Sequence, residues 1–289
     1  MVVATGFFDG VHIGHRHILA RLRSEALKRG TEGLVATFWP HPRTVLQDGA
    51  DSLRLLNSLD EKKALIAAQG ISRVEVLPFT KEFSRLTARE YLRDYVAGRF
   101  GGSAVLLGYD NRLGSDSLTA ERAALVASEL GLEVIMAEPV SLPGGQAVSS
   151  TKIRRDLADG LVRRAASMLG YSYSLRGVVV RGERLGRTLG FPTANLGLYD
   201  PLKIVPANGV YKVEVQTLGR QFKGMCNIGL RPTVNGRART IETNIFDFNE
   251  DIYGLDLKLT FLDKIREERR FPSLEALKAQ LEKDRLACL

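Results

Sequence analysis

The hydrophobic period of the chain changes once, near Gly170, and this change limits the folds that the sequence can adopt. Before it, short apolar runs alternate with segments whose apolar residues recur every three to four positions, as in helices. After it, segments such as VYKVEVQ (210–216) and DLKLTFL (256–262) alternate apolar and polar residues, as in strands with one buried face. We therefore predict two domains of different class, at residues 1–165 and 166–289.

The first domain is predicted to be a doubly wound, Rossmann-like α/β domain. Its apolar runs are nearly continuous and are separated by helical segments, which is typical of a parallel sheet covered on both faces. The first helix directly follows the first strand, and its apolar face is formed by Ile18, Leu19, Leu22 and Ala26. The predicted strands span residues 2–7, 33–39, 72–79, 103–109 and 132–138, and the later helices span residues 60–69, 87–100 and 119–131.

The second domain is predicted to be an antiparallel sheet or a small β-barrel. In residues 210–216 the apolar side chains fall on one face and the polar side chains on the other, and turn residues separate the strand candidates. The chain closes with a helical segment for which Ser273 is the expected N-cap. One face of this helix contains Leu274, Leu277 and Leu281.

The composition argues against several classes of protein. The 289 residues include only two cysteines, Cys226 and Cys288, which are far apart; this disfavours a disulfide framework or a zinc ribbon and suits a reducing cytoplasm. No apolar run approaches the ~20 residues that span a bilayer and no signal peptide is evident, so we expect no membrane partner. The net charge of +8 is spread over both halves, as in an enzyme that handles polyphosphates. The sequence indicates no particular oligomeric state.

The turn between the first strand and the first helix points most directly to function. Three of the four histidines of the chain lie within residues 12–17. Ligands of a doubly wound sheet bind at the carboxyl ends of its strands, where Gly10 and Gly14 let the backbone approach them closely. The helix N-terminus offers free N–H groups to an anion, and His12 and His15 add donors toward it. The pattern predicts a phosphate site.

Two motifs resemble those of the nucleotidyltransferase superfamily. GFFDGVHIGH (6–15) is similar to its GxFDGxHxGH motif, and SSTKIR (149–154) is similar to its (S/T)STxxR motif, in which the hydroxyls and the arginine hold the β- and γ-phosphates. The resemblance implies catalytic roles for His12, His15 and Arg154. The ATP-binding residues that it implies are Gly6, Phe7, Asp9, Gly10, His12, Gly14, His15, Ser149, Ser150, Thr151 and Arg154.

Two further stretches match positions of the same superfamily. His41 in WPHP and Asp110 in LLGYDNRLG correspond to residues near the flavin in those relatives that use one, so the resemblance implies a flavin-binding set of His41, Asp110 and Asn111. Most relatives have phenylalanine where this chain has Asn111 and Leu113. The departure concerns the packing of the flavin or adenine ring at this loop.

The string GRTLGFPTAN (186–195) resembles the signature of riboflavin kinase, whose fold is a six-stranded antiparallel barrel with a C-terminal helix. The resemblance implies that Thr193 and Asn195 hold Mg²⁺, which prefers oxygen ligands and substrate phosphates, and that Glu242 is the general base. Most relatives have histidine at the position of Asn244. The implied ATP-binding residues are Gly182, Gly186, Arg187, Gly190, Pro192, Thr193 and Asn195, and the implied riboflavin-binding residues are Asn227, Arg266, Glu268 and Phe271.

The order of the two modules is similar to that of the bacterial bifunctional riboflavin kinase/FMN adenylyltransferase (FAD synthetase) family, along nearly the whole chain. This resemblance implies that the C-terminal domain phosphorylates riboflavin to FMN with Mg²⁺ and ATP, and that the N-terminal domain adenylylates FMN to FAD and releases pyrophosphate. ATP, riboflavin and FMN are therefore the expected partners. Relatives usually carry a short segment ahead of the first strand, which leaves open a trimmed start.

Three alternatives stay open at this point. In the first alternative, only one of the two modules is active; the departures from the family pattern at Asn111 and Asn244 would allow this. In the second alternative, the second domain binds nucleic acid on its sheet surface. Such surfaces need exposed aromatic side chains, whereas the strand aromatics of this domain fall mainly on apolar faces, so we expect no nucleic-acid partner. In the third alternative, the first domain adenylylates a carboxylic acid as synthetases do. The GRTLGFPTAN string would have no role in that reaction.

Overall fold

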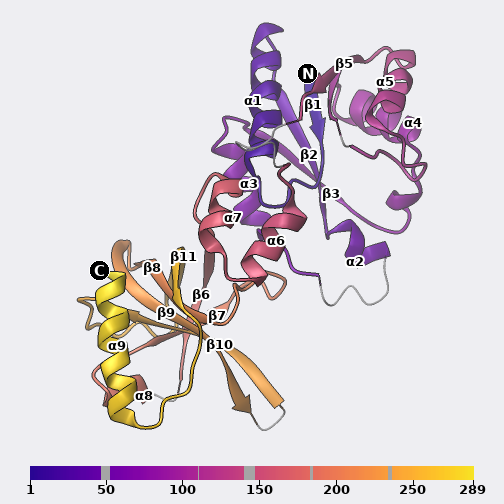
Figure 1. Ribbon diagram of the computed structural model, residues 1–289. Coiled ribbons are helices and arrows are strands. Elements are labelled where there is room, and N and C mark those ends of the chain that lie inside the picture. Colours follow the sequence, from indigo (N-terminus) through magenta and orange to yellow (C-terminus); the bar gives the residue numbers. More distant parts are fainter. Residues whose placement is uncertain (47–52, 110, 140–146, 183–184, 234–235) are drawn as a thin grey trace. The chain divides into compact units, whose positions relative to one another are not determined.

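The computed structural model describes residues 1–46, 53–109, 111–139, 147–182, 185–233 and 236–289. Its contacts divide the chain into two compact units, Met1–Ser150 and Thr151–Leu289. Each unit has its own sheet (Figure 1). The functional boundary at residue 165 stays a prediction; it falls inside a helix of the second unit.

The first unit is a five-stranded parallel sheet, as predicted. The strand order is β3-β2-β1-β4-β5, so the chain starts at the centre of the sheet and winds outward in both directions. The strands are β1 (Val2–Thr5), β2 (Gly33–Trp39), β3 (Arg73–Pro78), β4 (Ala104–Gly108) and β5 (Glu133–Ala137). The helical elements are α1 (Ile13–Lys28), α2 (Pro42–Leu46), α3 (Leu59–Ala67), η2 (Phe83–Arg85), α4 (Ala88–Tyr91), η3 (Leu92–Arg99) and α5 (Ala120–Glu129).

Helices cover both faces of this sheet, which confirms the doubly wound arrangement. On one face, side chains of α1 such as Leu19 and Leu22 pack with Val35 of β2 and Leu106 of β4. On the other face, α4, η3 and α5 pack on the opposite side of the same strands. The alternation of side chains along a strand explains the two separate cores, because neighbouring residues point to opposite faces.

One predicted helix differs in its geometry. Residues 87–100 were expected to form a single α-helix, but after Tyr91 the chain continues as the π-helix η3. The amide of Phe100, for example, donates to the carbonyl of Tyr95, five residues earlier. Over so short a segment the apolar period of a π-helix cannot be told from that of an α-helix, so sequence periodicity missed it.

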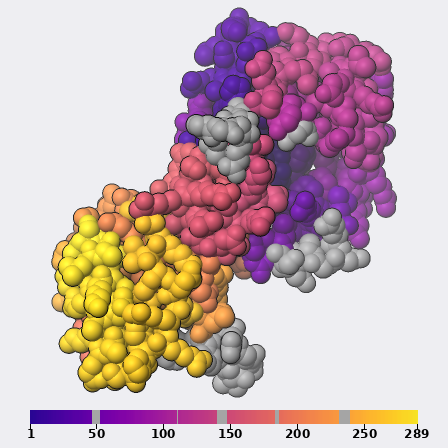
Figure 2. Space-filling view, viewed as in Figure 1, coloured from indigo at the N-terminus to yellow at the C-terminus, as the bar shows by residue number. Residues whose placement is uncertain are grey.

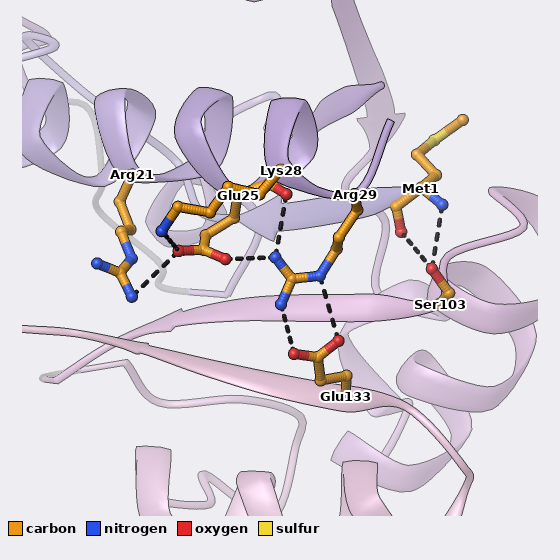
Figure 3. Close-up of polar contacts among 7 residues, drawn as sticks. All are labelled: Met1, Arg21, Glu25, Lys28, Arg29, Ser103 and Glu133. Atoms are coloured by element: carbon orange, nitrogen blue, oxygen red, sulfur yellow. Dashed lines mark hydrogen bonds and ion pairs between the residues drawn. The ribbon is translucent and has the colours of Figure 1, made fainter. Parts of the chain in front are cut away.

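An ionic network joins helix and sheet at the edge where the strands begin (Figure 3). Arg29, next to the end of α1, binds both Glu25 of that helix and Glu133 at the start of β5. Hydrogen bonds from Arg29 and Lys28 lower the pKa of Glu25 to about 2. At the same edge the amino group of Met1 donates to Ser103 Oγ at 3.2 Å. These contacts occupy the amino ends of the strands, and the opposite edge is the one at which a ligand is expected.

The second unit is a closed six-stranded antiparallel barrel, as the resemblance to riboflavin kinase implied. Around the barrel the order is β10-β7-β6-β11-β8-β9, and every pairing is antiparallel. The strands are β6 (Ser174–Val180), β7 (Ala194–Leu198), β8 (Gly209–Thr217), β9 (Arg220–Thr233), β10 (Gly236–Ile245) and β11 (Asp256–Arg266). The helices are α6 (Ser150–Ala158), which starts at the last residue of the first unit, α7 (Val162–Leu169), α8 (Leu185–Thr188) and α9 (Leu274–Cys288).

The C-terminal helix α9 lies across the outside of the barrel, where it contacts β8, β9 and β11 (Figures 1 and 2). Ser273 caps it as predicted, since its side chain accepts a hydrogen bond from the amide of Ala276. The predicted apolar face is only partly used. Leu281 packs on the barrel, whereas Leu274 is 55 % exposed, because the helix contacts the barrel mainly through its C-terminal half, where Asp284 and Cys288 are buried.

Candidate active sites

The turn that follows β1 has an unusual backbone. Between Thr5 and Ile13 three residues have positive φ, namely Phe8 at 55°, Gly10 at 84° and Val11 at 36°. Glycine adopts this conformation readily, whereas side chains with a Cβ do so at a cost. Strained non-glycine residues persist where the surrounding structure holds them, and they concentrate at functional sites. This turn places His12 and His15 at the N-terminus of α1.

His12 and His15 form a stacked pair at that N-terminus. His12 is the N-cap, and its Nδ1 accepts a hydrogen bond from the amide of His15 at 3.3 Å. The two rings are 3.6 Å apart with an interplanar angle of 16°. Burial lowers the pKa of His12 to about 4 and holds the pKa of His15 well below its usual range. At neutral pH the pair is therefore uncharged and presents imidazole donors and acceptors beside the helix N-terminus. His17 is exposed.

The carboxylate of Asp9 accepts hydrogen bonds from backbone amides of the protein. The side chain is buried; Oδ1 and Oδ2 accept the amide of Leu56 at 3.0 and 3.2 Å, and Oδ1 also accepts the amide of Asn57 at 3.3 Å. The carbonyl of Asp9 accepts a hydrogen bond from Ser150 Oγ at 2.9 Å. The first motif is thus tied both to the segment before α3 and to the start of the second motif. These hydrogen bonds of Asp9 hold the turn after β1 in place.

The second motif is divided between the units. Ser149 and Ser150 are partly buried and belong to the first unit. Thr151 is exposed on α6 and Arg154 is partly buried on the same helix, both in the second unit. Residues three and four apart share a face of a helix, so Thr151 and Arg154 lie on one side of α6.

Two of the three predicted flavin-binding residues, His41 and Asn111, lie near the ends of the central strands. The ring of His41 meets that of Phe7 edge-on, with centroids 4.2 Å apart. Asn111 Nδ2 donates to the carbonyl of Thr5 at 3.4 Å, which places it beside the end of β1. Asp110 lies outside the described residues. Leu113 is buried in the core on that face of the sheet, so the leucine at this position serves packing.

Lys62 is a residue of this site that sequence reasoning missed. It lies on α3, is only 2 % exposed, and donates from Nζ to the carbonyl of Phe7 at 3.0 Å and to Thr37 Oγ1 at 3.1 Å. A usable signal was present, since Lys62 precedes Ile66 by four positions and so shares the buried face of the helix. A lysine on an apolar helix face is an anomaly that needs a reason.

In the barrel, three predicted residues meet on adjacent strands. Asn195 of β7 pairs in register with Glu242 of β10, and Asn227 of β9 pairs with Glu242 on its other side. Thr193 Oγ1, just before β7, donates to Glu242 Oε2 at 3.5 Å. Hydroxyl, amide and carboxylate oxygens are thereby brought together, a donor set that suits a hard cation such as Mg²⁺. Within the described ranges there is no cluster of three or more His, Cys, Asp or Glu side chains that could hold a metal ion.

The glycine-rich loop approaches these residues closely. A Cβ at Gly182 would lie 2.3 Å from Asn195 Nδ2, and a Cβ at Gly186 would lie 2.3 Å from the carbonyl oxygen of Phe191. Gly190 has a φ of 85°, which favours glycine. Beside this loop is a pocket whose lining includes Arg187, Pro192, Thr193, Phe248, Asp251 and Tyr253.

Asn244, which replaces the histidine of most relatives, has a defined structural role. It is buried on β10, and its Nδ2 donates to the carbonyl of Pro192 at 2.7 Å. The amide side chain thus links β10 to the Pro-Thr turn of the signature. The position two residues before it, Glu242, is held by the register of the same strand.

The residues expected to bind riboflavin fall into two groups. Glu268 accepts a hydrogen bond from Asn208 Nδ2 at 3.0 Å and lies over β9, since a Cβ at Gly229 would be 2.4 Å from its Oε1. It is therefore close to Asn227, whose Nδ2 lies 3.3 Å from the same Cβ position. Arg266 differs: its guanidinium donates to both carboxylate oxygens of Asp284 on α9, at 2.7–3.0 Å.

Arg266 also donates to the carbonyl of Glu267 at 2.9 Å, so all three of its guanidinium nitrogens make hydrogen bonds inside the protein. Its guanidinium carbon lies 5.6 Å from the ring centre of Phe271. The bidentate geometry with a buried carboxylate is typical of a strong ion pair. Arg266 thus fastens the end of β11 to α9.

Comparisons with known proteins agree with both halves of the fold. The family model described as FAD synthetase matches residues 1–152, and the one described as riboflavin kinase matches residues 169–288. The curated bifunctional riboflavin kinase/FMN adenylyltransferases of Escherichia coli K12 and Bacillus subtilis 168 are 37 % and 34 % identical to the chain. These matches cover 99 % and 98 % of the chain and 90 % of each relative. The chain belongs to this family of bifunctional riboflavin kinase/FMN adenylyltransferases.

A solved structure is similar over nearly the whole fold. A crystal structure described as a macrolide-efflux protein from Streptococcus pneumoniae has a TM-score of 0.91 at 34 % identity, covering 99 % of this chain and 93 % of that one. Among the residues that the structure describes here, no helix is long and apolar enough to cross a bilayer.

Membership in the family assigns the two reactions to the two domains. The riboflavin kinase domain transfers a phosphoryl group from ATP to riboflavin and gives FMN. The FAD synthetase domain transfers an adenylyl group from ATP to FMN and gives FAD. FMN and FAD are therefore substrate and product of this chain. The predictions of fold and of activity are both confirmed; those of individual residue roles stay predictions.

Proposed function

We propose that the kinase reaction depends on Glu242 as general base, with Thr193 and Asn195 as the protein oxygens that hold Mg²⁺. The observation that carries this proposal is the contact between Thr193 and Glu242 beside the pocket. Riboflavin attacks through its terminal ribityl hydroxyl. Glu242 accepts the proton of that hydroxyl as the new O–P bond forms, and ADP leaves with the electrons of the broken bond.

Mg²⁺ would neutralise charge on the ATP phosphates near Thr193 and Asn195. The backbone around Gly182 and Gly186 would cradle these phosphates, because glycine lets this loop pack directly against Asn195 and Phe191. Asn244 keeps the Pro-Thr turn at a fixed distance from β10. The result is a site in which base, metal ligands and phosphate loop come from β10, β7 and the segment before β7.

For adenylyl transfer we propose that the turn after β1 binds ATP through backbone amides and the neutral imidazoles of His12 and His15. The phosphate of FMN is already an anion, so it attacks the α-phosphorus without a base, and pyrophosphate leaves. Arg154 would contribute through its guanidinium to the β- and γ-phosphates. Catalysis of this kind relies on positioning and on stabilisation of charge.

Because Cys226 and Cys288 are both buried free thiols, we further propose a cytoplasmic location.

The two sites predict separable lesions, which a flavin product assay by liquid chromatography measures. Glu242→Gln should lower FMN formation from riboflavin by ~10²–10⁴-fold, the usual contribution of a general base, and leave adenylylation of added FMN unchanged. The double variant His15→Ala, Arg154→Ala should abolish FAD formation and leave FMN formation unchanged. In each case the second reaction is the control for folding. A folded variant that loses both reactions would contradict one site per domain.

A further inference from the structure

A buried lysine lies beneath the turn that is proposed to bind ATP. Lys62 is on α3 and is 2 % exposed, whereas the next residue, Lys63, is exposed to solvent. Burial of a long, strongly hydrated ammonium is rare in proteins unless the group is paired. The surroundings of this one amino group therefore call for a physical explanation.

All three protons of the ammonium have acceptors, and every acceptor is a neutral oxygen. Nζ lies 3.0 Å from the carbonyl of Phe7, 3.1 Å from Thr37 Oγ1 and 3.5 Å from the carbonyl of Phe38. It also lies 3.8 Å from the centre of the Phe7 ring, within range of a cation–π contact. Among the described residues no carboxylate accepts a hydrogen bond from Lys62.

The charged and titratable groups that face Lys62 are few. Asp9 attracts the ammonium, but its carboxylate already accepts the amides of Leu56 and Asn57. His15 faces it from α1 and is uncharged at neutral pH. Burial outweighs the effect of Asp9 and lowers the pKa of Lys62 to about 8. At neutral pH Lys62 is thus still a cation, at a cost to stability that purely structural packing would avoid.

The ammonium connects the two loops that surround the site. The carbonyl of Phe7 accepts from Lys62 and also from Thr37 Oγ1 at 3.1 Å, which fixes the peptide that leads into strained Phe8. Its contacts to the end of β2 hold the segment that continues to His41, whose ring touches that of Phe7. One group therefore sets the position of the histidine turn relative to the end of β2.

We propose that Lys62 is a positioning residue for adenylyl transfer: its ammonium fixes the Phe7–Phe8 peptide, and with it the histidine turn, and places a positive charge beneath the ATP phosphates. The inference rests on the proposed role of that turn in binding ATP. A protonated amine is required, because a neutral one has two N–H groups for three acceptors and no charge to offer an anion.

Lys62→Met tests the inference, with Lys63→Met as a matched control on the same helix. Misplacement of catalytic groups by ~1 Å costs about 100-fold in rate, so kcat/KM for the conversion of FMN to FAD should fall by about that factor in Lys62→Met. Conversion of riboflavin to FMN by the same preparations should be unchanged, and Lys63→Met should behave as wild type in both reactions. A Lys62→Met protein within threefold of wild type in FAD formation would overturn the inference.

The pH profile separates a charge role from a merely structural one. In wild type the rate of FAD formation should fall above pH ~8, as the ammonium loses its proton. Lys62→Arg keeps its charge over the whole range and should lack this fall, and it provides the test should Lys62→Met not fold. The same alkaline fall in Lys62→Arg would contradict the inference. Retention of FAD formation by His15→Ala, Arg154→Ala would instead contradict the proposed ATP site.

Discussion

The most direct test of the local architecture is removal of the Asp9 carboxylate. Asp9 was expected from its motif to face ATP, yet its oxygens accept the buried amides of Leu56 and Asn57. Asp9→Ala leaves both amides without an acceptor. Each unpaired buried donor costs ~1–3 kcal/mol, so the free energy of unfolding of the first unit should fall by about 4 kcal/mol.

Asp9→Asn provides a graded comparison. One carbonyl oxygen remains to accept the amides, but the acceptor is neutral, and hydrogen bonds to charged groups are stronger by about 1 kcal/mol each. The expected loss is therefore about 2 kcal/mol. For a unit of this size each kcal/mol lowers the melting temperature by roughly 2–4 °C, so Asp9→Ala should melt about 8–16 °C below wild type and Asp9→Asn about 4–8 °C below.

Trp39 makes the measurement specific. It is the single tryptophan of the chain and it lies at the end of β2, so its fluorescence follows unfolding of the first unit. Riboflavin kinase activity measured at 25 °C serves as the control for the second unit. Should Asp9→Asn keep the wild-type melting temperature and show only a raised KM for ATP, the carboxylate would serve the ligand and the reasoning from its amide contacts would be refuted.

Two further predictions concern buried ionisable groups. Arg266→Met should destabilise the second unit by ~3–5 kcal/mol, because it removes the cationic partner of the buried Asp284 carboxylate. Calorimetry measures this loss of stability. Unchanged stability together with a raised KM for riboflavin would instead assign Arg266 to flavin binding. The first unit should lose stability as pH falls from 6.5 toward 4, because the unfolded chain protonates His12 at its ordinary pKa of 6.5 while the folded one does so only at about 4. The melting temperature read from Trp39 fluorescence should fall over this window by less in His12→Gln, and an identical fall in both proteins would disprove this cause.

The architecture was predictable because periodicity reports on burial. The strand at 33–39 was expected at the residues that β2 occupies, and the alternation in 210–216 became β8 with Tyr211, Val213 and Val215 buried. Such patterns depend on neighbours a few positions apart. They also predict which end of the sheet holds the site, since the glycines and histidines follow the first strand.

Contacts between distant parts of the sequence were not predictable in this way. The motif identifies Asp9 and Arg266 as functional, but whether a side chain faces a ligand or the protein depends on partners such as Leu56 and Asp284, which no local pattern specifies. The contacts of Lys62 were hidden for the same reason, because its acceptors lie on β2 and in the turn after β1. The spacing from Ile66 places Lys62 on the buried face of α3, but it does not show what the ammonium binds there.

The left-handed backbone at Phe8 and Val11 has a consequence for protein engineering. Glycine at either position would relax the main chain, but both side chains are buried in the core beneath α1, and losing them would cost more stability than the relaxed backbone returns. At Phe8 the change would also remove the ring that lies edge-on to His15, with the two ring centres 5.2 Å apart. Heat-tolerant variants are therefore better sought away from this turn, where stability can rise without disturbing the residues beside His15.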